Sequence, residues 1–209
     1  MTPKPASPKP SVVVFDLGGV LIDWNPRYLM NRLITDEPRR ERFLNEVLTH
    51  EFFMALDIAP DPRTAILPAV ARHPDYAEEI TAYIERFPET ISGDFPAMTA
   101  LVERLKEAGL HVCGLTNWAS DTFGLTRPRF PVLKQLRDIV VSGDEGLIKP
   151  DPRIFELACR RGGFSAGDAV FIDDSLRNAE AARSFGMAGI HHRSPEQTIA
   201  ELQALGLPA

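Results

Sequence analysis

The chain has 209 residues, of which 44% are hydrophobic and 25% are charged, which is an ordinary composition for a soluble globular protein. This length suits one hydrophobic core with a small insert, and a formal net charge of −6 argues against a nucleic-acid surface. Apolar stretches long enough for a membrane span or a signal peptide are missing, and two cysteines are too few for a disulfide framework. We expect a cytoplasmic protein with no nucleic-acid and no membrane partner.

The first predicted element is a strand that ends on a carboxylate. Residues 1–10 are rich in proline and lysine, have little to bury, and are predicted to form a mobile tail. Residues 11–15 are β-branched or aromatic in the main and predict a buried strand, which ends at Asp16. A carboxylate there is costly unless it is paired, hydrogen-bonded or bound to a metal, and the following Gly18 and Gly19 let a ligand approach the backbone. A simple turn stabilised by the Asp16 side chain is the alternative.

The next stretch, residues 26–93, differs from the rest of the chain. It has helical periodicity, as in residues 28–33 and 43–48, and no convincing strand. Prolines at positions 60, 62, 68, 74 and 88 divide it into short pieces. We predict a helical cap over residues 26–93 that acts as a lid on a core formed by residues 11–25 and 94–209.

From residue 94 onward, strands alternate with helices. Strands are predicted over residues 110–117, 138–142, 168–174 and 187–191. Helices are predicted from Pro96 to Ala108, after Asp151, after Ser175 and after Ser194, each with a start or stop signal such as an N-cap, a first-turn proline or a terminal glycine. This alternation predicts an α/β fold with a Rossmann-like parallel sheet covered on both faces.

Polar side chains follow three of the predicted strands. They are Asp16, the pair Thr116 and Asn117, and the pair Asp173 and Asp174, while Lys149 lies shortly after a fourth strand. Parallel strands place their carboxyl ends on one edge of a sheet, so these groups can converge. A divalent cation relieves the repulsion of clustered carboxylates, and lysine and threonine suit phosphate oxygens. The set predicts a phosphoryl-transfer site in which Asp16 could be the nucleophile.

The chain resembles the haloacid dehalogenase-like (HAD) hydrolase superfamily. Four segments carry the resemblance, in the superfamily's order and spacing: residues 15–21 (Phe-Asp-Leu-Gly-Gly-Val-Leu), 115–117 (Leu-Thr-Asn), 149–155 (Lys-Pro-Asp-Pro-Arg-Ile-Phe), and 171–175 (Phe-Ile-Asp-Asp-Ser) with Asn178. The helical stretch matches the position of a C1-type cap. The resemblance is greatest to bacterial glucose-1-phosphate phosphatase-like enzymes, which share Asp-Leu-Gly in the first segment.

The resemblance implies a nucleophile and a metal site. Asp16 would attack phosphorus and form an aspartyl-phosphate. Mg²⁺ would be held by Asp16, by the backbone carbonyl of Gly18 and by Asp174. Asp173 would support the metal directly or through water. An anionic nucleophile that attacks an anionic phosphate needs such cations, which agrees with this assignment.

The resemblance also implies how a phosphorylated substrate would be held. Thr116 and the backbone N–H groups near Leu17 and Asn117 would bind the phosphoryl oxygens, and Lys149 would neutralise charge on the nucleophile and the phosphate. Three residues at the passage into the cap could contact the rest of the substrate: Trp24, Asn25 and Arg27. The aromatic and apolar residues of the segment 51–57 are interpreted as helix-packing residues.

Gly18 departs from the superfamily's pattern. Most of its phosphatases have an aspartate at this position as general acid and base, and glycine cannot transfer a proton. Loss of such a group typically costs about 10²–10⁴-fold in rate. The candidates to compensate are a good leaving group, a metal-bound water and Asp23, although Asp23 is more often a turn residue at such a position. A positive φ at Gly18 would explain the glycine and would make a side chain there strained.

The function predicted first is a Mg²⁺-dependent phosphatase for a small-molecule phosphate ester, with sugar phosphates among the candidates. The alternative enzyme is a 2-haloacid dehalogenase, which uses the same nucleophile on carbon; the acidic pair Asp173 and Asp174 argues against it, because it would repel a carboxylate substrate. The third hypothesis is a non-catalytic binding protein that retains the fold. The oligomeric state stays open.

Overall fold

The computed structural model describes residues 9–209, so most of the predicted tail, residues 1–8, lies outside the described residues. A parallel five-stranded sheet in the order β5-β4-β1-β6-β7 forms the centre of the core. Its strands are β1 (Val12–Phe15), β4 (His111–Thr116), β5 (Ile139–Val141), β6 (Ala169–Asp173) and β7 (Ala188–His191). This confirms the α/β class and places β1 between β4 and β6, where the chain order reverses.

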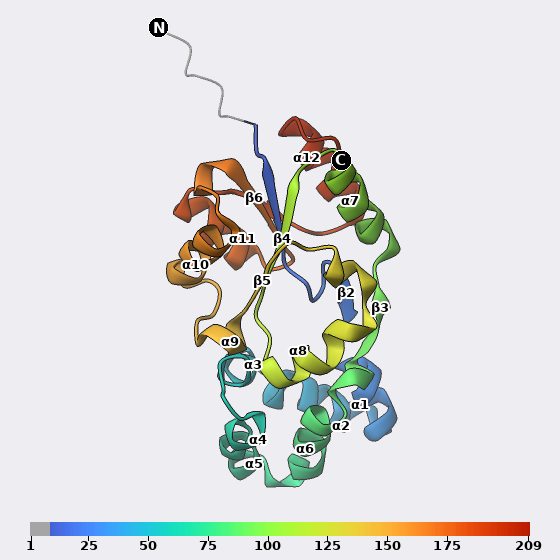
Figure 1. The fold of residues 1–209 in the computed structure, drawn as a ribbon. Coiled ribbons are helices and arrows are strands. Elements are labelled where there is room, and N and C mark those ends of the chain that lie inside the picture. The colour runs from blue at the N-terminus through green and yellow to red at the C-terminus, as the bar shows by residue number, and fades with distance from the viewer. Residues whose placement is uncertain (1–8) are drawn as a thin grey trace, which may run out of the picture.

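Helices cover both faces of the sheet (Figure 1). On one face lie α10 (Pro152–Gly162) and α11 (Leu176–Phe185), and on the other lie α7 (Pro96–Glu107) and α12 (Pro195–Ala204). Successive residues of a strand point to opposite faces, so Val12 and Val14 pack with Phe155, whereas Val13 and Phe15 belong to the cluster that includes Leu101. The strands are therefore apolar throughout and are buried on both sides.

The predicted start and stop signals of these helices act as expected. The Asp151 side chain accepts a hydrogen bond from the N–H of Arg153 at the start of α10, and Ser194 accepts one from Gln197 at the start of α12. The Gln197 side chain accepts from the N–H of Arg193 (2.9 Å), one residue before the position that a capping box uses. Short elements connect the rest: α8 (Ser120–Thr126), η4 (Arg127–Arg129), η5 (Pro131–Lys134), α9 (Ser142–Glu145) and η6 (Ala166–Asp168).

A group of short helices lies beyond the carboxyl edge of the sheet, at the bottom of Figure 1. Its members are α1 (Arg27–Leu33), α2 (Glu37–Arg42), the π-helical turn η1 (Phe43–Val47), α3 (His50–Asp57), α4 (Pro62–Ala65), α5 (Leu67–Arg72), η2 (Pro74–Tyr76), α6 (Ala77–Glu85) and η3 (Phe87–Thr90). Pro62 occupies the first turn of α4, whose N-cap is Asp61, so this proline starts a helix rather than interrupting one. Below we refer to these helices as the cap helices.

Two short strands connect the cap helices to the core and correct one expectation. The stretch up to residue 93 was predicted to contain no strand, yet β3 (Ile91–Asp94) pairs antiparallel with β2 (Ile22–Trp24). The sequence of β3, Ile-Ser-Gly-Asp, has low strand propensity. Its conformation depends on pairing with a segment almost 70 residues away, which local sequence patterns do not reveal. Among the described residues, no helix has the length and apolarity to span a bilayer.

Candidate active site

Three neighbouring strands deliver polar side chains to one edge of the sheet. Asp16 directly follows β1, Thr116 ends β4 and Asp173 ends β6. The N–H of Asp16 still belongs to the sheet and donates to the carbonyl of Ile172 (2.8 Å), which fixes where its side chain begins. All three residues are almost completely buried from bulk solvent. The topology thus converts positions far apart in the sequence into one cluster.

Lys149 is the cation of this cluster. Its Nζ lies 2.9 Å from Asp16 Oδ1 and 2.7 Å from Asp173 Oδ2, and its side chain is 1% exposed. Asn117 holds the Lys149 main chain in place, because its Oδ1 accepts from the Lys149 N–H (2.8 Å) and its Nδ2 donates to the Lys149 carbonyl (3.1 Å). The Asn117 side chain therefore fixes the position of the Lys149 main chain.

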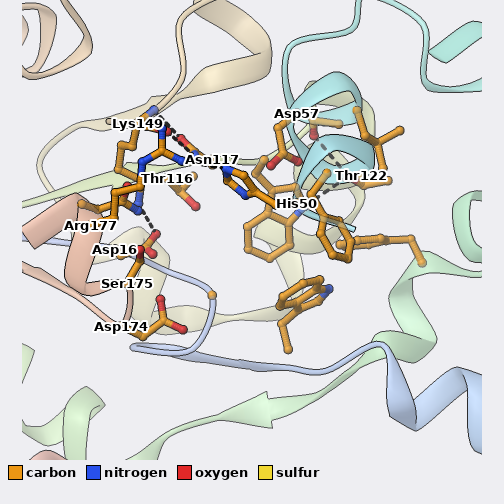
Figure 2. A pocket seen from close by; sticks show the side chains of 18 of the residues that line it. Asp16, His50, Asp57, Thr116, Asn117, Thr122, Lys149, Asp174, Ser175 and Arg177 are labelled. Carbon is orange, nitrogen blue, oxygen red and sulfur yellow. Dashed lines mark hydrogen bonds and ion pairs between the residues drawn. The ribbon is translucent and has the colours of Figure 1, made fainter. Parts of the chain in front are cut away.

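The two neighbouring aspartates Asp173 and Asp174 differ in their surroundings. Asp173 Oδ1 accepts from the Ser175 N–H (2.8 Å) and from Asn178 Nδ2 (3.1 Å), while Oδ2 accepts from Lys149. Its carboxylate is thus already bonded by the protein on both oxygens. Asp174 lines the cavity in front of Asp16, as Figure 2 shows. Of the two, Asp174 is the one whose carboxylate can reach a ligand.

The cluster has an excess of negative charge. Carboxylate oxygens of Asp16, Asp173 and Asp174 lie within 4.8 Å of one another. Burial raises the pKa of Asp16 and repulsion by Asp173 and Asp174 raises it further, although Lys149 opposes both. Burial lowers the pKa of Lys149, but Asp16 and Asp173 outweigh it and raise that pKa, so the amine stays charged. Three carboxylates and one ammonium leave two negative charges, which fits a divalent cation held by hard oxygen ligands.

The two glycines after the nucleophile have different roles. Gly19 has the positive φ, +75°, and a Cβ there would overlap the Asp174 carboxylate. Gly18 lacks a positive φ, and a Cβ there would meet only Trp24 Cβ, 4.0 Å away. The suggested positive φ at Gly18 is therefore wrong, and the backbone has room for a side chain at this position.

The polar cluster forms one end of a cavity of about 260 Å³, and the cap helices form the other end (Figure 2). Gly18, Thr116, Asn117, Lys149 and Asp174 line the core end together with Asp16. The cap end is mainly aromatic or apolar and includes Trp24, Phe53, Leu56, Tyr83, Phe87 and Trp118. A phosphate bound at the core end would leave the rest of its ester in this second part.

The residues predicted to contact substrate separate into two groups. Trp24 lines the cavity, whereas Asn25 and Arg27 do not. The Asn25 side chain accepts from the N–H of Arg27 (2.9 Å) at the start of α1, and the Arg27 guanidinium pairs with Glu41 at the surface (2.5 Å). Leu17, whose backbone N–H was predicted to bind a phosphoryl oxygen, is fully buried beside the nucleophile, and this N–H donates to Asp16 Oδ1 (2.7 Å).

Asp23, the suggested substitute for the missing acid, lies outside the cavity lining. Its carboxylate accepts hydrogen bonds from the hydroxyls of Tyr28 (2.9 Å) and Ser92 (2.6 Å), which tie β2 to α1 and β3. These bonds give it a structural role at the connection between cap helices and core.

Several lining residues escaped the sequence analysis. Asp57, at the end of α3, faces the cavity, and burial raises its pKa to about 7 although Lys149 lowers it. His50 Nε2 accepts from Arg177 Nη1 (3.0 Å), which joins α3 to α11 at the cavity. Phe53 and Leu56, interpreted as packing residues, line the cavity as well. Asp57 lies in the segment 51–57, whose aromatic and apolar residues predicted helix packing, so no local pattern marked its carboxylate as part of a site.

A buried hydroxyl links Asp57 to the core. Ser142 Oγ accepts from the N–H of Trp118 (2.8 Å) and donates to the main-chain carbonyl of Asp57 (2.7 Å). Ser142 is completely buried at the start of α9. The end of α3 is thereby held against the loop that follows β4.

Comparisons with known proteins agree with this arrangement. Residues 10–186 match a family model described as haloacid dehalogenase-like hydrolase. The chain is 31% identical over 195 residues to the sesquiterpene phosphatase astK of Aspergillus oryzae, covering 92% of this chain and 94% of that protein. It is 27% identical over 192 residues to a phosphoglycolate phosphatase of Thiobacillus denitrificans, with 83% and 79% covered.

The fold also has solved counterparts. A HAD family enzyme from Bacteroides thetaiotaomicron superposes with a TM-score of 0.68 at 20% identity, covering 94% of this chain and 99% of that one. At this identity the likeness concerns the fold alone, and it includes both the sheet and the region of the cap helices, since nearly all of both chains is covered.

Proposed function

Since this chain belongs to the haloacid dehalogenase-like hydrolase family and has phosphatases among its relatives, we propose that it is a Mg²⁺-dependent phosphatase that hydrolyses a small phosphorylated metabolite through an aspartyl-phosphate. The observation that carries the proposal is the cluster of Asp16, Lys149, Asp173 and Asp174 at one end of a cavity. It combines a buried nucleophile, a fixed cation and an uncompensated charge of −2. A cytoplasmic location is part of the proposal, in keeping with the free thiols of Cys113 and Cys159.

In the first step, an Asp16 carboxylate oxygen attacks phosphorus, the bond between phosphorus and the alcohol oxygen breaks, and that oxygen leaves with a proton taken from an acid in the cavity or from water. Lys149 stays within hydrogen-bond distance of Asp16 and offsets the charge of nucleophile and phosphate. Thr116, at the end of β4, faces the same space and would donate its hydroxyl to a phosphoryl oxygen.

In the second step, water attacks phosphorus, the bond to Asp16 breaks, and inorganic phosphate leaves, which restores the carboxylate. Asp16, the Gly18 carbonyl and Asp174 would hold Mg²⁺, and Asp173 would support the site through Lys149. When bound, Mg²⁺ supplies charge neutralisation between the carboxylates and the phosphate.

The dehalogenase hypothesis has less support. A haloacid dehalogenase would also use Asp16, with the bond between carbon and halogen breaking and halide leaving. The uncompensated negative charge beside Asp16 would then repel the carboxylate of a 2-haloacid. The non-catalytic hypothesis leaves the buried contact between Asp16 and Lys149 without a purpose, since such a charged cluster is costly to keep.

Hydrolysis of p-nitrophenyl phosphate tests the proposal. We expect phosphate release that requires Mg²⁺, stops with a chelator, and returns when Mg²⁺ is added in excess. Chloride release from 2-chloropropionate is measured in parallel. Chelator-resistant dehalogenation without phosphatase activity would move the assignment to the dehalogenases, and inactivity in both assays would favour the binding protein.

A further inference from the structure

The cap end of the cavity is walled by aromatic side chains from separate segments. We call Trp24, Phe53, Tyr83, Phe87 and Trp118 the aromatic chamber. Neighbouring rings in it make edge-to-face contacts, with centroids 5.5 Å apart for Trp24 and Phe53, 6.1 Å for Phe53 and Tyr83, and 5.7 Å for Phe87 and Trp118. The ring packing defines the shape of the space and offers an apolar surface to whatever enters it.

Few polar groups in this part of the cavity are free to bind a ligand. The Thr122 hydroxyl accepts from Trp118 Nε1 (3.1 Å) and donates to the Ala119 carbonyl (3.2 Å). His50 is engaged by Arg177. The polar groups that remain are the Trp24 indole N–H, which has no acceptor among residues 9–209, the Asp57 carboxyl, and the hydroxyl of Tyr83, whose pKa burial and the neighbouring Asp57 raise.

This composition discriminates between kinds of alcohol. A sugar carries several hydroxyls that lose water on entering, and here most of them would find no partner, at about 1–3 kcal/mol each. An apolar chain or ring loses nothing comparable and gains from burial against the rings.

We infer that the aromatic chamber binds the alcohol part of the substrate and that this alcohol is apolar, an alkyl or aryl-alkyl group with at most one or two polar atoms. This inference rests on the proposed function and narrows it. It argues against sugar phosphates, which the sequence analysis had among its candidates, and against a substrate as small and polar as 2-phosphoglycolate.

The test compares esters whose phosphate is the same. With activity on p-nitrophenyl phosphate first established, kcat/KM is measured for 2-phenylethyl phosphate, decyl phosphate, glucose 6-phosphate and 2-phosphoglycolate. We expect the two apolar esters to exceed the two polar ones by about 100-fold or more. Equal or higher values for the polar esters would overturn the inference and leave the phosphatase proposal intact, whereas failure with p-nitrophenyl phosphate would count against the phosphatase itself.

A binding measurement and a matched pair of variants complete the test. Free 2-phenylethanol should inhibit competitively, and glucose should not. Phe53→Leu should raise KM for 2-phenylethyl phosphate about tenfold, since it removes one wall of the aromatic chamber. Leu67→Ala, which changes an exposed apolar residue of α5, should leave KM unchanged. An unchanged KM in a folded Phe53→Leu protein would place the alcohol elsewhere.

A separate observation concerns the proton that the leaving alcohol needs. Attack by Asp16 in line with the breaking bond sends the alcohol oxygen to the side of phosphorus away from Asp16, which is the side of the cap helices. Figure 2 shows Asp57 across the cavity from Asp16. Gly18 provides no acid and the Asp23 carboxylate is bonded to Tyr28 and Ser92. Of the carboxyl groups that line the cavity, Asp16 and Asp174 lie together at the core end, so Asp57 is the one that would face the departing oxygen.

The environment of Asp57 suits an acid. Six other titratable or charged groups line the same cavity: His50 from α3, Tyr83 from α6, Arg177 from α11, and Asp16, Lys149 and Asp174 at the core end. Burial prevails over the attraction of Lys149 and gives Asp57 a pKa of about 7. A substantial fraction of Asp57 thus carries a proton at neutral pH, near the optimum for general acid catalysis.

We propose that Asp57 is the catalytic acid that replaces the aspartate missing at position 18. It gives its proton to the alcohol oxygen as the bond from phosphorus to that oxygen breaks. In the second step its carboxylate takes a proton from the attacking water, which returns Asp57 to its starting form and balances the cycle.

The test uses two esters of similar shape and different leaving groups. Asp57→Asn should lower kcat/KM for 2-phenylethyl phosphate about 100-fold. The loss for p-nitrophenyl phosphate should be at least ten times smaller, because nitrophenolate leaves without a proton. The decline of the alkyl-ester rate above about pH 7 should disappear in this variant. Asp23→Asn serves as the control and should change neither the ratio of kcat/KM between the two esters nor the pH profile of the alkyl ester.

A second substitution protects the test against misfolding. Gly18→Asp, for which the backbone has room, should restore alkyl-ester hydrolysis when combined with Asp57→Asn. An equal loss for both esters in Asp57→Asn, or no loss for either, would overturn the assignment of Asp57.

Discussion

The two ends of the cavity are built by different means. At the core end, Asp16, Thr116 and Asp173 extend from neighbouring strands, and hydrogen bonds from Lys149, Asn117 and Asn178 hold the cluster. At the cap end, the aromatic chamber is assembled from short helices, the loop after β4 and the last residue of β2, and its side chains are held by ring contacts. A hydrogen-bonded cluster tolerates almost no displacement, whereas apolar packing accepts other residues of similar volume. The core end therefore sets the reaction, and the cap end sets which ester undergoes it.

The sharpest test of this division is Asp16→Asn, which keeps the size of the nucleophile and removes its charge. We expect a loss of about 10⁴-fold or more in kcat, equal for alkyl and aryl esters, because the nucleophile acts on every substrate. Phosphate release is measured for both esters, and thermal unfolding shows that the fold persists. Beryllium fluoride with Mg²⁺ should raise the Tm of the wild type and not that of the variant. A variant that hydrolyses one ester at the normal rate would break the comparison.

The next largest effect is expected for Lys149→Met, which leaves three neighbouring carboxylates without their cation. Removing one partner of a buried charged cluster typically costs about 3–5 kcal/mol, which for a chain of this size lowers Tm by about 10 °C. Lys134→Met, on the exposed side of η5, is the matched control and should leave Tm unchanged. Thermal unfolding is followed in a chelating buffer, and equal Tm values for the two variants would show that Lys149 does not stabilise the three carboxylates.

A smaller loss is expected for Asn117→Ala, which frees the main chain of Lys149. Two hydrogen bonds disappear, and the two buried groups they served cost about 1–3 kcal/mol each when unpaired. kcat should fall for all esters together, while the preference among esters stays as in the wild type. A changed preference would mean that Asn117 contacts the alcohol.

The last effect concerns the cap end and is visible only as a difference between two pH values. Asp57 loses its proton near pH 4 in the unfolded chain and near pH 7 in the folded one, so folding stability falls as pH rises through this window and is lowest above pH 7. The Asp57→Asn variant has no carboxyl group at this position, so its folding stability does not fall in this way as the pH rises. A shift of about three pKa units corresponds to about 4 kcal/mol, so the Tm of the variant should exceed that of the wild type by up to about 10 °C at pH 8, and the difference should vanish near pH 4. An advantage that is the same at both pH values would mean that Asp57 ionises normally in the fold.

The same division explains what could be predicted from the sequence. Asp16, Thr116 and Asp173 each follow a strand with a clear apolar run, and the rule that strand ends converge brings them together without further information. Asp57 and Tyr83 lie in amphipathic helices whose relative placement depends on tertiary packing, so their meeting in one cavity has no local signal. β3 could not be predicted for the same reason, because its strand conformation depends on pairing with β2. Asn25 and Arg27 follow Trp24 directly, yet the start of α1 turns them away from the cavity.

The hydrogen bond from Ser142 to the Asp57 carbonyl also says something about the timing of turnover. One such buried bond between neutral groups contributes about 0.5–1.5 kcal/mol net, which corresponds to a ratio of closed to open forms on the order of 2 to 13. This bias adds to the apolar contacts between the cap helices and the core, such as that between the rings of Phe87 and Trp118. Alcohol and phosphate would leave from the open form, so the bond that positions Asp57 for chemistry also lengthens the time for which the products stay, by no more than this factor.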